Sequence, residues 1–394
     1  MTKVDRWLLP EGIEEVLPSR AFQVERLRRR LLDFYHSWGY DLVIPPLVEF
    51  TDSLLSGSGG DLDLMTFKLT DQVSGRMMGV HADVTPQTAR MDAHSLRRQG
   101  PNRLCYASTV LYTRPRSPLA SRNPIQVGVE LYGEPGLAAD IEVISLLCEA
   151  LEHVGVGEVC LDLGHVGIYR GLEEWLELDR GAATELFDLM QSKSCELDAW
   201  LAANIDDAAI ADMLRALPGL TGDRNVIDRA RTVLARAPAE IELALDELEA
   251  VVDAVADAVP GATLYLDLCE LEGYHYHTGI VFGAYAPGLR QAVGNGGRYD
   301  DIGETFGRAR PATGFGIDLK ALAELLDGTE SPPAGIYAPP SDEPAQRQAV
   351  RDLRARGERV VCGFPGQVPD YESLHCDRHL VAEGDRFIVK PIRD

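Results

Sequence analysis

The sequence has little positive charge. Only 38 Lys and Arg residues stand against 62 Asp and Glu residues, which gives a formal net charge of −24 over 394 residues. Proteins that bind a nucleic-acid backbone use clustered Lys and Arg, so this balance argues against a large tRNA or DNA surface. An organism whose proteins are acidic throughout is the alternative explanation for the charge. Under both explanations a nucleic-acid partner is disfavoured.

Long apolar runs and paired cysteines are also absent from the sequence. No run approaches the ~20 apolar residues of a membrane span, and the opening MTKVDRWLLP does not have the pattern of a signal peptide. The cysteines are odd in number, widely scattered and without a CxxC pair, which is typical of reduced thiols. We therefore expect a soluble, cytoplasmic protein without a membrane partner. The seven cysteines are residues 105, 148, 160, 195, 269, 362 and 376.

The length and composition are those of a globular protein with more than one domain. A chain of 394 residues with 45% hydrophobic and 25% charged residues has room for two or three domains with a buried core. No internal repeat or low-complexity tract is present. The Pro-rich stretch PPAGIYAPPSDEP, residues 332–344, indicates a linker near the C-terminal end. We expect a core over residues 1–330 and a small domain over residues 331–394.

The first third of the chain predicts helices alternating with strands. Apolar residues recur at helical spacing over residues 19–38, and Gly39 ends the helix. DLVIPPLVEF, residues 41–50, reads as a strand whose two prolines suit a sheet edge. Residues 65–71 and 75–85 read as a hairpin, and residues 86–98 as a helix that begins with proline. A second hairpin is predicted from residues 104–112 and 125–133, with a polar loop that holds Arg114, Arg116 and Arg122.

The rest of the core predicts a helical insertion between strands. A helix over residues 140–155 and a strand over 158–165 are followed, from about 170 to 257, by a segment rich in Ala, Leu and Glu with helical periodicity. Strands return in residues 262–285 and 291–300, and residues 312–326 read as a strand that enters a helix. The tail reads as β-α-β over residues 334–364, with a closing strand pair over 379–392.

Taken one at a time, the polar motifs have simple structural explanations. NGGRYD, residues 295–300, is explained by a glycine turn, and Asp83 to Thr85 by a helix cap before Pro86. His275 and His277 share one face of a strand, as half of a metal site would, but no third ligand accompanies them. Gln126 and Glu130 fall on the same side of a strand. Glu130 is then either a paired buried carboxylate or a ligand for an amine or imidazole.

The order of these motifs resembles the catalytic core of the histidyl-tRNA synthetase family, from about Leu8 to Leu326. GYDLVIPPLVE is similar to motif 1 of class II synthetases, HADVTPQTAR to the loop that binds the amino group, and residues 103–133 to motif 2. LEGYHYHTGIVF and GNGGRYD are similar to the two histidine signatures, and ATGFGIDLKAL to motif 3. The resemblance implies an α+β fold: a class II aminoacyl-tRNA synthetase-like antiparallel sheet flanked by helices, with a helical insertion and a small C-terminal α/β domain.

The sequence departs from this family where ATP is activated. Alignment with the family's motifs puts Leu111, Glu272 and Ala321 at the positions of three arginines that face phosphate and carboxylate, and Thr113 at a glutamate that helps to hold adenine. One preorganised charge typically contributes about 2.7–4 kcal/mol to transition-state stabilisation. The loss of three cations, one of them replaced by an anion, predicts a protein without adenylation activity. Arg114, Arg116 and Arg122 are not placed near a phosphate by the sequence.

The positions that the resemblance implies to bind the amino acid are closer to the family's pattern than the positions implied to bind ATP. The resemblance implies that Asp83 and Thr85 hold the α-amino group of histidine, with Asp where the family has Glu. It implies that Gln126 and Glu130 receive the amino group and the imidazole. Glu272 removes the partner of the ligand's carboxylate, and a relic cavity is the alternative to a live pocket. The histidine-binding residues implied by the resemblance are Asp83, Thr85, Gln126, Glu130, Tyr276 and His277.

A synthetase-like core without these arginines resembles the family of regulatory subunits of short-form ATP phosphoribosyltransferase. The tail of about 60 residues is too short for the anticodon-binding domain of a synthetase. The resemblance implies a non-catalytic subunit that joins a short catalytic subunit in a hetero-octamer, takes L-histidine as effector and forms a homodimer through motif 1. The short tail and the net charge argue against tRNA recognition, and we expect no metal and no cofactor. The alternatives are a divergent histidyl-tRNA synthetase or another amino-acid-activating enzyme, and a free-standing histidine sensor.

Overall fold

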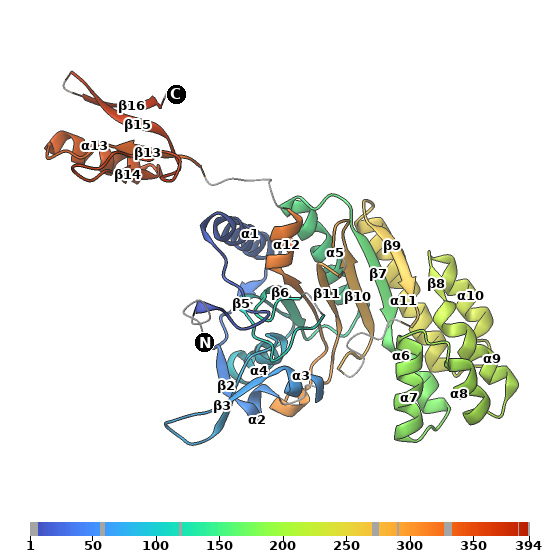
Figure 1. The fold of residues 1–394 in the computed structure, drawn as a ribbon. Helices are drawn as coiled ribbons and strands as arrows, with labels where there is room; N and C mark the ends of the chain where they lie inside the picture. The colour runs from blue at the N-terminus through green and yellow to red at the C-terminus, as the bar shows by residue number, and fades with distance from the viewer. Residues whose placement is uncertain are drawn as a thin grey trace. The chain divides into compact units, whose positions relative to one another are not determined.

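The computed structural model describes residues 7–55, 60–117, 120–269, 276–289, 291–326, 333–384 and 386–392. The chain forms two compact units, Met1–Asp327 and Gly328–Asp394. Figure 1 shows the elements of both. Among the described residues, no helix combines the length and the apolar character that a membrane crossing requires.

The first unit is built on one large mixed sheet, whose described strands run in the order β1-β5-β6-β12-β11-β10-β7-β9-β8. Neighbouring strands are antiparallel except for two parallel pairs, β1 with β5 and β7 with β9. The predicted synthetase-like sheet flanked by helices is therefore confirmed, with parallel pairs near its two ends. The strands are β1 Asp41–Leu42, β5 Asn102–Thr109, β6 Ile125–Tyr132, β7 Cys160–His165, β8 Thr221–Gly222, β9 Thr263–Asp267, β10 Ile280–Tyr285, β11 Gly294–Arg298 and β12 Ala312–Asp318.

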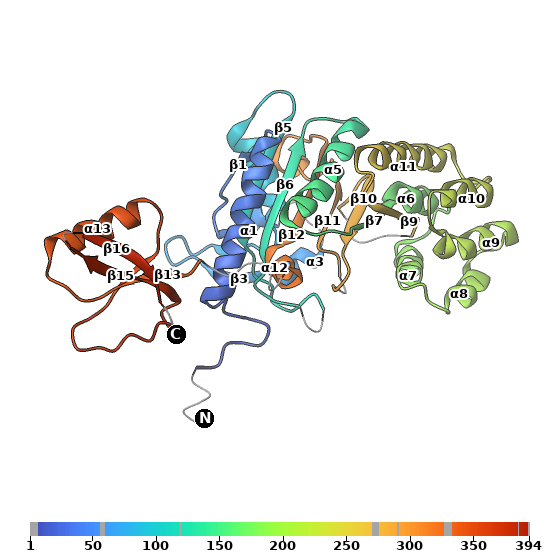
Figure 2. The same ribbon diagram turned by 90° about the horizontal axis from the view of Figure 1, so that it is seen from above.

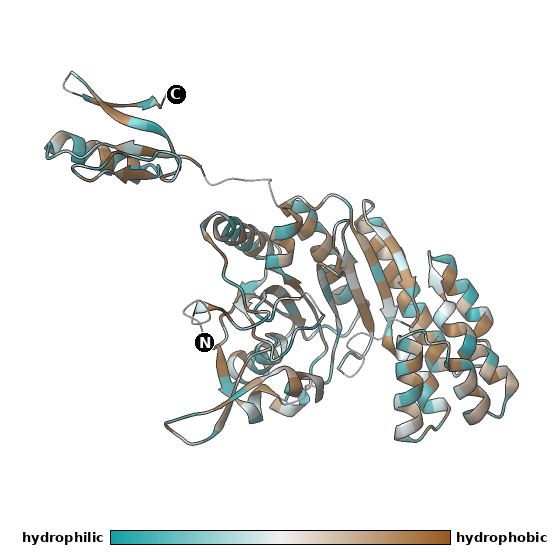
Figure 3. Cartoon of the chain, in the orientation of Figure 1, coloured by the Kyte–Doolittle hydropathy of each residue, from teal (hydrophilic) through white to brown (hydrophobic). Residues whose placement is uncertain are grey.

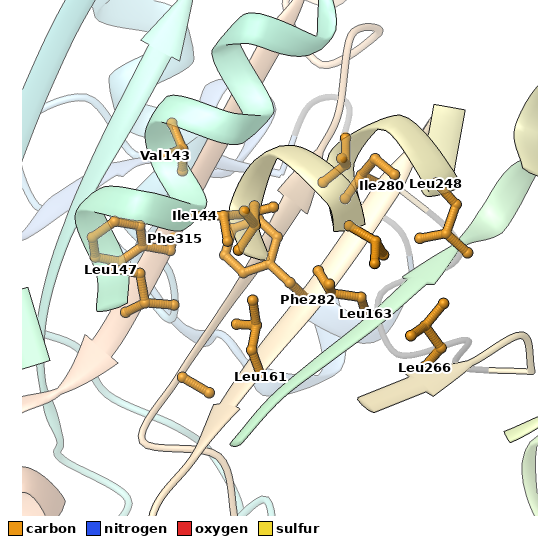
Figure 4. Packing of buried hydrophobic residues seen from close by; sticks show 14 of the residues in the cluster. Val143, Ile144, Leu147, Leu161, Leu163, Leu248, Leu266, Ile280, Phe282 and Phe315 are labelled. Carbon is orange, nitrogen blue, oxygen red and sulfur yellow. The ribbon is translucent and has the colours of Figure 1, made fainter. Parts of the chain in front are cut away.

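One face of this sheet is apolar and covered by helices. The helices are α1 Pro18–Ser37, α5 Leu137–Val154, α11 Ala239–Ala258 and α12 Leu319–Leu325, and Figure 2 shows α1, α5 and α11 along the same side of the strands. Phe282, Phe315 and Leu163 from the strands pack with Ile144 and Leu147 of α5 (Figure 4). Burial of such side chains contributes roughly 1.5–3 kcal/mol each, so this interface is a main source of stability for the first unit.

Two glycines of β11 let helix α5 come close to the sheet. A Cβ atom built on Gly294 would lie 3.1 Å from Leu147 Cδ1, and one built on Gly296 would lie 2.8 Å from the Phe282 ring. At the end of the same strand, Arg298 forms a buried ion pair with Asp140 of α5, with Nη2 2.6 Å from Oδ2. The GNGGR segment therefore has a packing role on the helix side of the sheet.

A second, three-stranded sheet of order β2-β4-β3 lies in the first unit. The predicted hairpin is confirmed as β3 Phe67–Thr70 and β4 Met77–Val80, which pair antiparallel. The single strand predicted over residues 41–50 is wrong. It is two strands, β1 Asp41–Leu42 and β2 Val48–Phe50, in different sheets, because Pro45 and Pro46 donate no backbone hydrogen bond between them.

Short helices follow these strands. They are α2 Thr51–Leu54, α3 Gly60–Met65 and α4 Thr85–Arg90, and α4 continues directly into a π-helical turn over Met91–Leu96. The turn ends at Arg97, whose φ of 50° is left-handed. A helix over residues 86–98 was predicted, and the change of helix type within it was not.

The helical segment between β7 and β9 is present. Its helices are α6 Val166–Trp175, α7 Arg180–Gln191, α8 Leu197–Asn204, α9 Ala208–Ala216, α10 Asn225–Val233 and α11 Ala239–Ala258. Asp179 caps α7 and Asp207 caps α9 through their side chains. Figure 3 shows that hydrophilic and hydrophobic residues alternate along these helices, which is the pattern of helices that bury one side.

The second unit contains a four-stranded sheet of order β14-β13-β15-β16 and one described helix. The predicted β-α-β is confirmed as β13 Gly335–Ala338, α13 Pro344–Ala355 and β14 Val360–Cys362, with β13 and β14 parallel. The closing strand pair is β15 Cys376–Glu383 and β16 Arg386–Pro391. Part of the stretch predicted as a linker therefore forms β13.

Candidate functional site

The face of the large sheet away from α5 is polar and lined by glycine. Residues directly opposite each other in antiparallel strands share a face. The register therefore puts Glu130 of β6, Gly314 of β12 and Gly297 of β11 in one row on this face. A second row runs from Gly128 through Gly316 to Asn295. Because glycine has no side chain, neighbouring side chains lie directly over these rows: Glu130 over Gly314, His277 over Gly297 and Gln126 over Gly316.

Glu130 lies over Gly314 and is buried, with 1% of its surface exposed. Three hydroxyl groups donate to its carboxylate: Thr85 Oγ1 at 2.9 Å, Tyr106 Oη at 3.2 Å, and Tyr299 Oη. Burial raises the pKa of Glu130 to about 8, and the three hydroxyl donors oppose that rise without cancelling it. The carboxyl group is therefore a buried, hydrogen-bonded acceptor that holds a proton near neutral pH.

Asp83, Thr85 and Gln126 form a hydrogen-bonded array beside Glu130. Asp83 Oδ1 accepts from Thr85 N at 3.1 Å and from Gln126 Nε2 at 3.1 Å. Gln126 Oε1 accepts from Val84 N at 3.2 Å. Asp83 and Thr85 are only partly buried, so this end of the array is partly exposed. Four of the six predicted side chains are thus brought together by direct hydrogen bonds.

Helix α4 is fixed behind this array by contacts with the predicted motif 1. Gln87 Nε2 donates to Pro46 O at 2.8 Å and to Glu49 Oε1 at 2.9 Å. Arg90 Nη2 lies 2.6 Å from the same oxygen of Glu49 in a largely buried ion pair. Since α4 begins at Thr85, these contacts hold the Thr85 hydroxyl against Glu130.

The other two predicted residues lie on the same face, farther along the sheet. The Tyr276 and His277 rings are 4.2 Å apart. The buried His277 ring lies over Gly297, since a Cβ atom built there would be 2.9 Å from His277 Nε2. Gly297 is two strands away from Glu130 in the row described above. Tyr276 and His277 therefore lie toward the β11 side of this face, away from the Glu130 array.

Two of the three positions implied to have lost a cation are described, and neither offers a charge. Leu111 follows β5 and its backbone N donates to His81 O at 3.1 Å. Ala321 lies in the first turn of α12, where its backbone N donates to Asp318 Oδ1 at 3.3 Å. Glu272 lies outside the described residues. The nearby Thr113 donates to the backbone oxygen of Leu64 at 2.6 Å.

A pocket of about 390 Å³ adjoins Gln126 on the side away from Glu130. Arg116 lines it, with its Cζ atom 4.7 Å above the ring centroid of the buried Tyr112. Arg122, by contrast, donates to the backbone oxygens of Tyr112 and Glu11, at 3.0 and 2.9 Å. The predicted loop arginines therefore have different positions, and Arg116 is the one that reaches this pocket. Its lining residues are Tyr112, Arg116, Ser117, Ala120, Ser121, Pro124, Gln126, Tyr285, Gln291, Ala292, Val293, Asn295, Gly316, Ile317 and Asp318.

Tyr106 and Tyr299 are functional candidates that the sequence analysis missed. Tyr106 of β5 lies opposite Gly128, and Tyr299 directly follows β11, so both point to the polar face. The signal was present in the strand alternation, because Tyr106 lies two residues along β5 from Leu104, which pairs with Glu130. It depended on the hairpin register, which the sequence did not fix.

Carboxyl, amide and hydroxyl groups of Glu130, Asp83, Gln126 and Thr85 are therefore gathered in one hydrogen-bonded cluster on the polar face of the sheet. Among the described residues, no group of three or more His, Cys, Asp or Glu side chains is placed to hold a metal ion.

Comparison with protein families divides the chain in two. Residues 12–322 match the histidyl-tRNA synthetase family, and residues 333–390 match the C-terminal domain of ATP phosphoribosyltransferase subunit HisZ. A protein of Saccharophagus degradans named ATP phosphoribosyltransferase regulatory subunit is 55% identical over 394 residues, which cover 100% of both chains.

Solved structures match the fold over nearly the whole chain. A Bacillus halodurans protein, described as an ATP phosphoribosyltransferase regulatory subunit/histidyl-tRNA synthetase, superposes with a TM-score of 0.84 at 27% identity, over 95% of this chain and 97% of that one. A histidyl-tRNA synthetase from a Nostoc species has the same fold, with a TM-score of 0.78 at 19% identity over 95% of this chain and 91% of that one.

Proposed function

This chain belongs to the family of ATP phosphoribosyltransferase regulatory subunits, and we propose that it serves that enzyme as a non-catalytic subunit and histidine sensor. The reaction, the first step of histidine biosynthesis, joins ATP to phosphoribosyl pyrophosphate on a partner subunit. L-histidine, the end product of the pathway, binds the site around Glu130 of this chain. Binding changes the activity of the partner through a coupling free energy of about 1–3 kcal/mol.

The observation that carries the histidine assignment is the pair of acidic groups at the two ends of the polar array. Glu130 is buried and accepts hydroxyl hydrogen bonds, which suits the imidazole. Asp83, fixed by Gln126 and the Thr85 backbone, suits the α-amino group. Thr85 contacts both acids, so one residue spans the distance between the two ends of the ligand. That spacing fits a small amino acid with a basic side chain.

The proposed absence of catalysis rests on the apolar side chains at two key positions. Transfer of an adenylyl group builds negative charge on phosphate, and stabilisation of that charge requires preorganised donors or cations. Leu111 and Ala321 provide neither from their side chains, and Lys320 next to Ala321 is buried and paired with Glu14, with Nζ 3.2 Å from Oε1. ATP chemistry therefore belongs to the catalytic partner.

The proposed assembly is a hetero-octamer with the short catalytic subunit, built on a homodimer of this chain. The support for the homodimer is an exposed apolar segment at the β1 end of the sheet order. Leu42, Ile44 and Leu47 are more than half exposed there, and Ile44 is 82% exposed. Exposed apolar side chains that lie together on a surface are typical of an interface.

A reconstitution experiment tests the proposed function. The purified chain is mixed with the short catalytic subunit, and phosphoribosyl-ATP formation is measured with and without histidine. We expect activity that requires both subunits and responds to histidine. A catalytic subunit that is equally active alone and indifferent to histidine in the mixture would overturn the proposal.

The rival function, amino-acid activation, has its own assay. The isolated chain is incubated with histidine, ATP and labelled pyrophosphate, and then with tRNA. We expect pyrophosphate exchange and aminoacylation at the level of a control without protein. Histidine-dependent exchange well above that control would make the chain a divergent synthetase.

A further inference from the structure

The loop that carries Asp83 and Thr85 begins at a buried histidine, His81. This residue is fully buried, and its side chain takes no part in the ligand contacts proposed above. Its backbone is fixed in both directions, because His81 N donates to Leu47 O at 3.1 Å and His81 O accepts from Leu111 N at 3.1 Å. A buried imidazole needs a hydrogen-bond partner at each ring nitrogen. The partners of the two nitrogens therefore determine which protons the ring carries.

The Nε2 atom of His81 faces a group that can only accept a hydrogen bond. It lies 2.8 Å from the backbone oxygen of Thr109, the last residue of β5. A carbonyl oxygen has no proton to give, so this bond forms only if Nε2 carries the proton. The hydroxyl group of Ser108 also lies near Nε2, at 3.3 Å, and is the weaker contact at that distance. The shorter contact therefore assigns a proton to Nε2.

The Nδ1 atom of His81 faces the side-chain amide of Gln87 in α4, with Nδ1 and Oε1 2.5 Å apart. The orientation of an amide is assigned from its other contacts. The nitrogen of this amide lies 2.8 Å from Pro46 O and 2.9 Å from Glu49 Oε1. A reversed amide would put its oxygen against a carbonyl and a carboxylate, which are both acceptors. The amide oxygen therefore points to His81, and Nδ1 carries a proton as well.

An imidazole with a proton on both nitrogens is a cation. Its two contacts, at 2.5 and 2.8 Å, are short, as charge-assisted hydrogen bonds are. On β2, Glu49 accepts from the same Gln87 amide that receives the His81 proton, so an anion lies one side chain away from the ring. On α4, Arg90 pairs with that carboxylate, with Nη2 2.6 Å from Oε1. On the loop itself, Asp83 accepts from its own neighbours in the ligand site.

We propose that His81 is a buried imidazolium whose two N–H groups position the loop that holds the amino group of the ligand. One N–H group ties this loop to α4, and the other ties it to the end of β5, where Ser108 pairs with Gln126 of the site. His81 acts through Gln87 and Thr109 and not through the ligand, so it is a positioning residue. The positioning role rests on the proposed histidine site, whereas the charge of the ring rests on its own contacts.

NMR spectroscopy of the full-length chain, labelled with nitrogen-15 histidine and without ligand, measures the charge of the ring at pH 7. The two nitrogens of an imidazolium have similar chemical shifts, whereas the unprotonated nitrogen of a neutral ring is shifted far from the other. The chain has nine histidines, so the His81 signals are identified as those that disappear in His81→Gln or in His81→Arg. We expect similar shifts for the two His81 nitrogens. Widely separated shifts would overturn the proposal, whatever the chain binds.

Calorimetric titration of the same proteins with L-histidine measures the positioning role. A neutral amide has one donor end and one acceptor end, so in His81→Gln one of the two acceptors loses its partner, and histidine affinity should fall roughly tenfold. His81→Arg keeps a positive charge and only donors, so it should restore most of the affinity. His36→Gln, at an exposed position of α1, is the matched control and should bind as wild type does.

The outcomes separate this role from the proposed function. A His81→Gln chain that binds histidine as wild type does would overturn the positioning role. Equal losses in His81→Gln and His81→Arg would also overturn it, because the charge would then make no difference. A wild-type chain that binds no histidine would overturn the histidine site itself, and the NMR shifts would still decide the charge of His81.

Discussion

Glu130 is the residue on which the sensor role can be tested most directly. Replacement by Gln keeps its size and removes its acidity, so the imidazole loses a charge-assisted partner worth about 1.5–3 kcal/mol. Histidine affinity of Glu130→Gln should fall roughly ten- to a hundredfold in calorimetric titration at pH 7. Glu152→Gln, an exposed acid of α5, is the matched control and should bind as wild type does. Equal affinities of wild type and Glu130→Gln would place histidine elsewhere.

The raised pKa of Glu130 also predicts how binding depends on pH. Below pH 8 the carboxyl group already holds the proton that the Glu130–imidazole pair needs. Above pH 8 that proton must come from solvent, so affinity should fall about tenfold per pH unit. The fall between pH 8 and 9 should be steeper in wild type than in Glu130→Gln, in titrations repeated in buffers of different ionisation enthalpy. The same slope in both proteins would exclude Glu130 as its source.

The same group predicts a loss of stability with rising pH. Because the pKa is about 8 in the folded chain and near its ordinary value of 4.5 in the unfolded chain, the unfolded chain loses the proton first. The folded state is therefore penalised progressively from about pH 4.5 to 8, by at most about 1.4 kcal/mol per pH unit. Denaturant unfolding of wild type and Glu130→Gln at several pH values should show their difference changing over this window. A constant difference would contradict the prediction.

At this scale, the sequence predicted the position of some site residues and not of others. Gln126 and Glu130 were placed on one face because strand alternation has a fixed period of two. Asp83 and Thr85 reach them because proline starts a helix beside the strand, a local signal. Tyr106, Tyr299 and Arg116 depend on hairpin register and on a loop after the strand, and both are set by tertiary packing. The alternation of a single strand contains no information about these three.

At the scale of elements, the glycine rows of β11 and β12 let the side chains of the site lie directly against the sheet. A Cβ atom built on Gly314 would overlap Glu130 Oε2 and lie 2.5 Å from Val129 O. Gly314→Ala should therefore lower the free energy of unfolding by about 1–3 kcal/mol, as overpacking does, and weaken histidine binding. Gly261→Ala is the matched control, because nothing lies within 4 Å of its Cβ position. Thermal unfolding and titration of both variants test this, and a Gly314→Ala chain as stable as the control would contradict it.

Element boundaries were predicted well where the periodicity was long and poorly where prolines intervened. Helix α1 and the β5–β6 hairpin follow patterns of many residues, so one atypical residue does not change the prediction. The segment over residues 41–50 is apolar throughout, and its composition alone favours one strand. The two prolines interrupt the backbone pairing, and the halves join different sheets. The π-helical turn after α4 has no sequence signal that we can name.

At the scale of the whole molecule, the exposed segment at β1 predicts a homodimer. Ile44→Asp puts a charge on a side chain that is 82% exposed in the single chain, so it should not affect folding. It should prevent burial of that side chain between two copies and shift wild-type dimers to monomers in light scattering at micromolar concentration. Val368→Asp, at a position that is 93% exposed in the second unit, is the control. A monomeric wild type would contradict the dimer itself.

The negative charge is distributed unequally between the two units. Gly328–Asp394 contains 11 acidic and 9 basic residues, a formal charge of −2, so −22 of the total lies on the synthetase-like unit. In a synthetase the corresponding unit must tolerate the acceptor end of a tRNA, which carries one negative charge per nucleotide. The charge of this unit therefore supports the proposal that its ligand is a small zwitterion and not a polyanion.

The sheet has a polar face and an apolar face covered by helices. Its thickness sets the distance that the proposed regulatory signal must cover. Val127 and Val129 of β6 alternate with Gln126, Gly128 and Glu130 along one strand, so the ligand side and the helix side are separated by a single layer of backbone. In the proposed histidine site, the ligand is therefore separated from α1 and α5 by one layer of backbone. The proposed regulatory signal therefore has a single layer of backbone to cross.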